Sequence, residues 1–164
     1  MQEQLQAIVT VLSLVNPVIC GAMFGRVEAE RSAVERRADA TKVALAMVII
    51  LTVAALIGTR LLHLFGVSLD AFMVAGGGVL AWMGFSMLSG QASSSSPDAP
   101  SAQGKPLTPL ILFAASPGTI TGVITLSAAY TRLGFPVTAL VAVAVASALT
   151  WLAMLLVARG PPIG

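Results

Sequence analysis

Charge is the scarcest property of this 164-residue sequence. Only 10% of the residues are charged, whereas 57% are hydrophobic. A soluble domain carries roughly 25% charged residues, and the mean hydropathy of this chain is +0.92. The apolar residues also lie in long runs rather than at every third or fourth position. This composition excludes a soluble globular protein and predicts an integral membrane protein.

Reactive side chains are almost as scarce. The chain has one cysteine, Cys20, and one histidine, His63, which excludes an intrachain disulfide and a metal-ligand cluster. No Asp, Glu, Lys or Arg lies at the centre of an apolar run, and the sequence has no phosphate-binding loop or nucleophile elbow. We therefore expect no enzyme, no cofactor and no metal. Because the basic residues sit at the ends of apolar runs, we expect no nucleic-acid partner.

The long apolar runs are what the sequence has in abundance. A helix that spans a bilayer needs about 20 mostly apolar residues. The five runs of this kind are Leu5–Phe24, Val43–Phe65, Phe72–Leu88, Leu107–Tyr130 and Phe135–Ala158. We predict an all-α fold, a polytopic transmembrane bundle of about five helices. The first run lacks the basic flank and cleavage site of a signal peptide, so we expect it to be retained.

Two polar stretches separate these runs. Residues 26–42 carry mixed charges at spacings that favour a short, solvated surface helix; the alternative is a regulatory or partner-binding loop. Residues 91–106 are rich in Ser, Pro, Ala and Gly and predict a flexible linker. The linker divides the chain into a first three-helix repeat, 1–90, and a second, incomplete repeat, 107–164.

The basic residues predict the orientation. With the N-terminus outside, seven of them fall inside and two outside, and the positive-inside rule favours this arrangement. The inside set is Arg26, Arg31, Arg36, Arg37, Lys42, Lys105 and Arg159, and the outside set is Arg60 and Arg132. We therefore expect a multi-pass protein of the bacterial inner membrane with an external N-terminus.

Prolines interrupt the first and fourth runs. The first contains Asn16-Pro17 and the fourth contains Ser116-Pro117. Because three runs separate one break from the next, the second half enters the membrane from the opposite side. This predicts an inverted repeat of three plus three helices, common in secondary transporters. The spacing of the two halves would start a sixth helix near residue 164, so the sixth helix is apparently missing.

Small residues accompany the breaks and the third run. Glycines four residues apart let helices approach closely in a membrane, and such pairs follow both prolines. The third run contains "AGGG", for which a packing surface or hinge and a ligand site are both open readings. The expected helix-packing residues are Gly21, Gly25, Gly76, Gly77 and Gly122.

A broken helix at membrane depth leaves backbone donors and acceptors unpaired, which is tolerated where they line a polar cavity. The half-helix after each proline presents its positive end, which can hold a carboxylate, and unwound carbonyls can coordinate a cation. This predicts a central site for a small polar or zwitterionic solute. Its expected lining is Asn16, Pro17, Ser116, Pro117, Gly118, Thr119 and Thr121.

Three motifs, "LVNPV", "HLFGVSLDAFMVAGGGVLAWMGFSML" and "PLILFAASPGTITGVI", resemble the MarC family of bacterial inner-membrane proteins, also called UPF0056. The resemblance runs from about residue 5 to the end of the chain. By position it falls on Asn16, Pro17, Phe72, Ala75, Gly76, Gly77, Pro117, Gly118, Thr119 and Thr121. Ser116 and Asp70 depart from the family pattern, which usually has glycine and proline there and six helices in all.

The resemblance implies a place among membrane proteins related to exporters of the LysE type. We therefore expect a secondary transporter of small polar solutes, with neutral amino acids as the leading class. The alternative is a non-transporting membrane protein, either an assembly or regulatory partner or a degenerate, truncated family member. The partners expected are the lipid bilayer and a small polar solute, and a homo-oligomer is left open.

Overall fold

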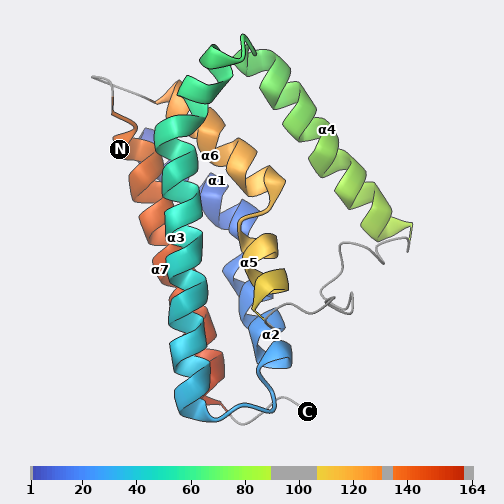
Figure 1. Ribbon diagram of the computed structural model, residues 1–164, viewed down its shortest axis with the longest axis vertical. Coiled ribbons are helices and arrows are strands. Elements are labelled where there is room, and N and C mark those ends of the chain that lie inside the picture. Colours follow the sequence, from blue (N-terminus) through green and yellow to red (C-terminus); the bar gives the residue numbers. More distant parts are fainter. Residues whose placement is uncertain (1, 90–106, 131–134, 161–164) are drawn as a thin grey trace.

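The computed structural model describes residues 2–89, 107–130 and 135–160. Within these ranges it is a bundle of seven helices (Figure 1): α1 Gln2–Val15, α2 Pro17–Val27, α3 Ala33–Leu64, α4 Leu69–Leu88, α5 Thr108–Ala114, α6 Pro117–Ala129 and α7 Val137–Arg159. The pairs α1–α2 and α5–α6 are each one interrupted span, so the described residues contain five spans long and apolar enough to cross a membrane. This confirms the predicted all-α, five-span bundle. The predicted linker lies outside the described residues.

The predicted and the observed span boundaries differ most at the start of α3. Ser32 forms a capping box with Glu35: the Ser32 N–H donates to Glu35 Oε2 at 3.0 Å, and the Glu35 N–H donates to Ser32 Oγ at 3.4 Å. This reciprocal cap starts a helix, and α3 then continues for 32 residues into the membrane span. The separate, solvated surface helix predicted for residues 26–42 is therefore wrong. Glu28, Arg36 and Asp39 in this stretch are buried.

The centre of the bundle is formed by α3 and α7, which lie side by side along its length (Figure 1). Both broken spans pack on them: α7 contacts α1, α2 and α6, and α3 contacts α5 and α6. Fully buried apolar side chains from four of these elements, Val11, Met47, Leu110 and Met154, lie in the core. Helix α7 therefore contacts both broken spans, α1–α2 and the α6 half of the second.

Helix α4 is attached differently. The chain turns at Gly66, whose φ of 68° favours glycine, and α4 then leans away from the bundle (Figure 1). Its main contact is with α6. Only 6% of the most apolar window in its span, Leu69–Ser86, is buried, against 50% for Leu110–Ala129. The second broken helix is thus the most enclosed span, and α4 covers one side of it.

Candidate functional site

The first break is built by Asn16 and Pro17. Asn16 has φ 48° and ψ 81°, a left-handed conformation that Asn adopts more readily than most residues because its short side chain bonds locally. Its Oδ1 accepts a hydrogen bond from the Ile19 N–H at 3.3 Å. Pro17 begins α2, where a missing N–H costs no helical hydrogen bond. The Asn-Pro pair thus ends one half-helix and starts the next.

Cys20 satisfies a carbonyl group that the break would leave unpaired. The thiol is 1% exposed and donates to the Val15 carbonyl at 3.3 Å. In an unbroken helix this carbonyl would accept from the Ile19 N–H, which here bonds to Asn16 instead. Cys20 is therefore a buried core residue that also closes the hydrogen bonding around the break.

The second break is built by Ser116 and Pro117 in a more ordinary way. Ser116 has extended backbone angles and its Oγ accepts from the Thr119 N–H at 3.3 Å, as an N-cap. The Ser116 and Thr119 hydroxyls also lie 3.1 Å apart, within hydrogen-bonding distance. The Thr121 hydroxyl donates to the Pro117 carbonyl at 2.8 Å. Three of the predicted site hydroxyls are therefore engaged within the first turns of α6.

The two broken spans lie against each other in opposite directions. Helix α1 contacts α6, and α2 contacts α5, so the first half of each span meets the second half of the other. At this crossing the Leu14 side chain occupies the space in which Gly122 lacks a Cβ. The two breaks are thereby held part-way along the long axis of the bundle (Figure 1).

The second half of each broken span also packs on a long helix through glycine. In the first span, a Cβ on Gly21 would lie 3.6 Å from Ala153 Cβ of α7. In the second, Ile124 of α6 fills the space beside Gly58 of α3. The matching pairs α2 with α7 and α6 with α3 are what an inverted repeat would produce.

Helix α4 covers the second break but not the first. Leu80 lies against Gly118, and Gly76 lies against Thr121, so that an added Cβ at either glycine would clash. Gly118 and Thr119 are both buried. In α2, by contrast, Val18 is 78% exposed and Ile19 is 43% exposed. Beyond the two prolines, the first turn of α6 is thus more enclosed than the first turn of α2.

The predicted site residues therefore form two groups on neighbouring helices. Asn16 and Pro17 are half-buried, and Ser116 to Thr121 range from buried to exposed at Pro117. Two open cavities, of about 490 and 280 Å³, lie elsewhere, toward the end of the bundle where α3 meets α4. The first is lined by residues that include Thr59, His63 and Ser68.

The predicted packing glycines differ in whether a neighbouring helix lies against them. At Gly76 and Gly122 a side chain of a neighbouring helix occupies the place of a Cβ, whereas at Gly21 a Cβ would make an ordinary contact with Ala153, and Gly25 is buried. At Gly77 an added Cβ would meet no heavy atom within 4 Å. The "AGGG" run thus contacts α6 through Gly76.

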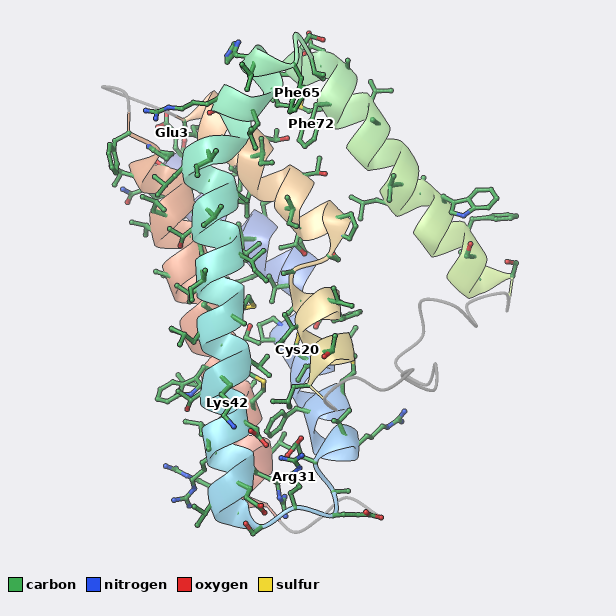
Figure 2. All side chains as sticks on the ribbon, in the orientation of Figure 1. Glu3, Cys20, Arg31, Lys42, Phe65 and Phe72 are labelled. Carbon is green, nitrogen blue, oxygen red and sulfur yellow. The ribbon has the colours of Figure 1, made fainter. Side chains whose placement is uncertain are left out.

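Sequence reasoning missed a charged cluster at the other end of α2. Arg31 bonds to Asp39 at 2.6 Å and lies 3.5 Å from Glu28, and Lys42 bonds to Asp39 at 2.7 Å. Arg31 and Lys42 lie at the same end of the bundle (Figure 2). The mixed charges of residues 26–42 were the available signal, but the sequence does not show which of them are turned inward.

A family model described as "MarC family integral membrane protein" matches residues 1–159. The chain belongs to the MarC family. This confirms the resemblance of the three motifs and fits the two proline breaks and the "AGGG" helix described above.

Similarity to individual MarC proteins is confined to part of the chain. The UPF0056 membrane protein PH0760 of Pyrococcus horikoshii is 40% identical over 82 residues, which are 50% of this chain and 41% of that protein. The UPF0056 membrane protein YhcE of Escherichia coli is 34% identical over 79 residues, 48% of this chain and 37% of that protein. The matched stretch thus spans about two fifths of these relatives. No solved structure matches the chain.

Proposed function

We propose that this MarC family member is a secondary transporter of small polar solutes, with neutral amino acids as the leading class. The observation that carries the proposal is the antiparallel pairing of two broken helices, α1–α2 and α5–α6, each restarted part-way through the bundle by a polar N-cap, Asn16 or Ser116. Broken helices at membrane depth are the places where secondary transporters bind solutes.

The chemistry of the breaks suits a zwitterion. The N-terminal ends of α2 and α6 carry partial positive charge that favours a carboxylate. Each proline also lacks the N–H that the carbonyl four residues earlier would use, which leaves Ser13 and Phe113 carbonyls as acceptors for an ammonium group or a cation. The proposal needs no enzymatic reaction and no cofactor. It names the class of solute and takes no particular substrate from exporters of the LysE type.

Transport is tested with the purified chain in proteoliposomes and a panel of labelled neutral amino acids. We expect uptake that Asn16→Ala and Thr121→Ala reduce at least tenfold. Thr10→Ala is the matched control, because the Thr10 hydroxyl bonds back to the Gln6 carbonyl at 2.8 Å within α1, as Thr121 bonds back to Pro117. Solute movement no faster than in empty liposomes, or equal losses in all three variants, would contradict the proposal.

The second candidate is a non-transporting membrane protein in which the breaks serve packing. The observation that favours it is the local satisfaction of the Ser116, Thr119 and Thr121 hydroxyls, together with the cover that Leu80 gives Gly118. If the breaks serve only packing, Thr121→Ala changes the unfolding temperature by the same amount with and without added amino acids. Added amino acids would then raise the thermal stability of neither wild type nor variant.

We also propose that the α2–α3 end of the bundle faces the cytoplasm of a bacterial inner membrane. In the described residues this end carries Arg26, Arg31, Arg36, Arg37, Lys42 and Arg159, and the α3–α4 end carries Arg60. Positive residues favour the cytoplasmic side. A reporter enzyme inserted after Ala29 and another inserted after Val67 should give opposite topology signals, and a periplasmic signal at residue 29 would reverse the assignment.

A further inference from the structure

The turn between α2 and α3 encloses two carboxyl groups. Glu28 is 0% exposed and the Asp39 side chain is 3% exposed. Both contact the same guanidinium group: Glu28 Oε2 lies 3.5 Å from Arg31 Nε, and Asp39 Oδ2 lies 2.6 Å from Arg31 Nη1. Arg31 stands beside both and is 39% exposed.

The hydrogen-bond donors near the two carboxyl groups bind mainly to Asp39. Asp39 receives Arg31 Nη1 at 2.6 Å and Lys42 Nζ at 2.7 Å. Among the described residues neither oxygen of Glu28 has a hydrogen-bond partner, and its ion pair with Arg31 Nε is longer, at 3.5 Å. Arg36 is also buried, but its Nε donates to the Arg31 carbonyl at 3.1 Å. Glu28 is thus a fully buried carboxyl group with no donor of its own.

A buried carboxylate without hydrogen bonds is costly, whereas the protonated acid is neutral and can donate. We propose that Glu28 is a proton-binding site: protonated, it donates its O–H to Asp39 and stabilises the α2–α3 turn, and it releases this proton to water at that end of the bundle. Like-charged carboxylates that share a site bind the first proton tightly for this reason. The Asp39 charge stays on the oxygens that face Arg31 and Lys42.

The groups around Glu28 support one shared proton. The charges that act on its carboxyl group come from Asp39 and Glu35 of α3 and from Arg31 of the turn, which lies 3.5 Å from Glu28 Oε2. Helix α2 carries exposed Arg26, and α7, which packs on both α2 and α3, brings Arg159 to the same end. Burial raises the pKa of Glu28 above its ordinary value, Arg31 opposes this, and Asp39 adds to it.

The proton site is separate from the proposed solute site but is joined to it by a rigid element. Helix α2 has 11 residues, with Asn16 as the N-cap at one end and Glu28 as the C-cap at the other. The inference concerns proton binding and holds whether or not the protein transports a solute. If the transport proposal is also correct, Glu28 is the group through which a proton gradient would act on α2.

The direct test is an infrared titration of the full chain in lipid nanodiscs from about pH 4 to about pH 9, a range that spans ordinary Glu values and well above. We expect a protonated-carboxyl band that persists above the ordinary Glu range in the wild type and is absent in Glu28→Gln. Glu30→Gln is the matched control, because Glu30 lies in the same turn and is exposed; it should keep the band. A wild-type band that disappears in the ordinary Glu range, or one unchanged by Glu28→Gln, would overturn the proposal.

Two neighbours should move the titration in opposite directions. Asp39→Asn keeps an acceptor but removes a negative charge, so the Glu28 band should titrate at lower pH than in the wild type. Arg31→Gln removes the nearby cation, so the band should titrate at higher pH. Shifts in the same direction, or no shift in either variant, would contradict a proton held between Glu28 and Asp39.

Thermal unfolding gives an independent measurement. A group whose pKa is raised by folding stabilises the protein below its unfolded pKa, and this contribution is lost as pH rises through the folded value. The wild-type midpoint should therefore fall as pH rises through the Glu28 transition, and the Glu28→Gln midpoint should stay level there. Because Gln resembles the protonated acid, a Glu28→Gln protein less stable than wild type at neutral pH would also contradict the proposal.

Discussion

Gly76 of α4 lies directly against the Thr121 side chain of α6, so closely that a Cβ at residue 76 would overlap Thr121 Cγ2. The Thr121 side chain cannot easily turn away, because it is β-branched and its hydroxyl bonds to the Pro117 carbonyl at 2.8 Å. This contact is part of the seam by which α4 is held to the bundle.

Gly76→Ala should therefore weaken the seam. Overpacking costs about 1–3 kcal/mol, and we expect a loss of unfolding free energy in that range. The neighbouring Gly77→Ala is the matched control, since its new methyl group would meet no heavy atom within 4 Å. Alanine is the better helix former by about 1 kcal/mol, so Gly77→Ala should be neutral or stabilising. The unfolding free energy of both variants is measured in detergent. Equal changes in the two would contradict a tight contact between Gly76 and Thr121.

A second prediction concerns the crossing of the two broken helices. Gly122→Ala should place its methyl group against the Leu14 side chain, at a cost of about 1–2 kcal/mol. Leu14→Ala makes the space for that methyl group. In a double-mutant cycle the two changes should couple by about 0.5–3 kcal/mol, with the double variant more stable than the sum of the singles. Simple additivity would mean that the two residues do not touch.

The left-handed backbone of Asn16 makes a third prediction. Asn16→Ala removes the cap on Ile19, worth about 1 kcal/mol, and with it the local hydrogen bonding that lets Asn tolerate the left-handed region, where alanine is strained by about 1–2 kcal/mol. Asn16→Gly removes the same cap without the backbone strain. Alanine should therefore destabilise the protein more than glycine does, as measured by thermal unfolding. The reverse order would argue against the positive φ.

Cys20 provides a natural reporter for the first break. The thiol is 1% exposed and bonded to the Val15 carbonyl, so a maleimide reagent should label the native protein far more slowly than the denatured one. Asn16→Ala should accelerate labelling by loosening the first turn of α2, and Asn16→Gly should do so less. Glu30→Cys in a Cys20→Ser background is the exposed comparison and should react rapidly, because Glu30 is exposed in the turn between α2 and α3, outside the membrane spans. Rapid labelling of the native wild type would contradict the burial of Cys20.

Much of the fold was predictable because membrane spans are long. The five runs of apolar residues fall on the five observed spans, and both prolines fall at observed helix starts. The start of α3 is not predictable in this way, because the mixed charges of residues 26–42 favour a separate surface helix. Ser32 and Glu35 instead cap a helix that enters the membrane without interruption.

What could not be predicted is which face of each helix meets a neighbour. The sequence identifies Gly76 and Gly77 as equally small, but successive residues point about 100° apart on a helix, and Gly76 is the one that meets Thr121. Likewise, the mixed charges of residues 26–42 do not reveal that Glu28 and Asp39 turn inward while Glu30 stays exposed. Each of these outcomes depends on how helices distant in sequence pack together.

The position of α7 has a consequence for biogenesis. Helix α7 contacts α1, α2, α3 and α6, yet it is the final span of the described chain. During synthesis α1 and α2 reach the membrane before α7, with a polar break that still lacks this packing partner. Groups that are unpaired in lipid are costly, so the early spans must remain shielded by the insertion machinery or by one another until residues 137–159 arrive. The packing of the early spans is therefore completed only once α7 has been made.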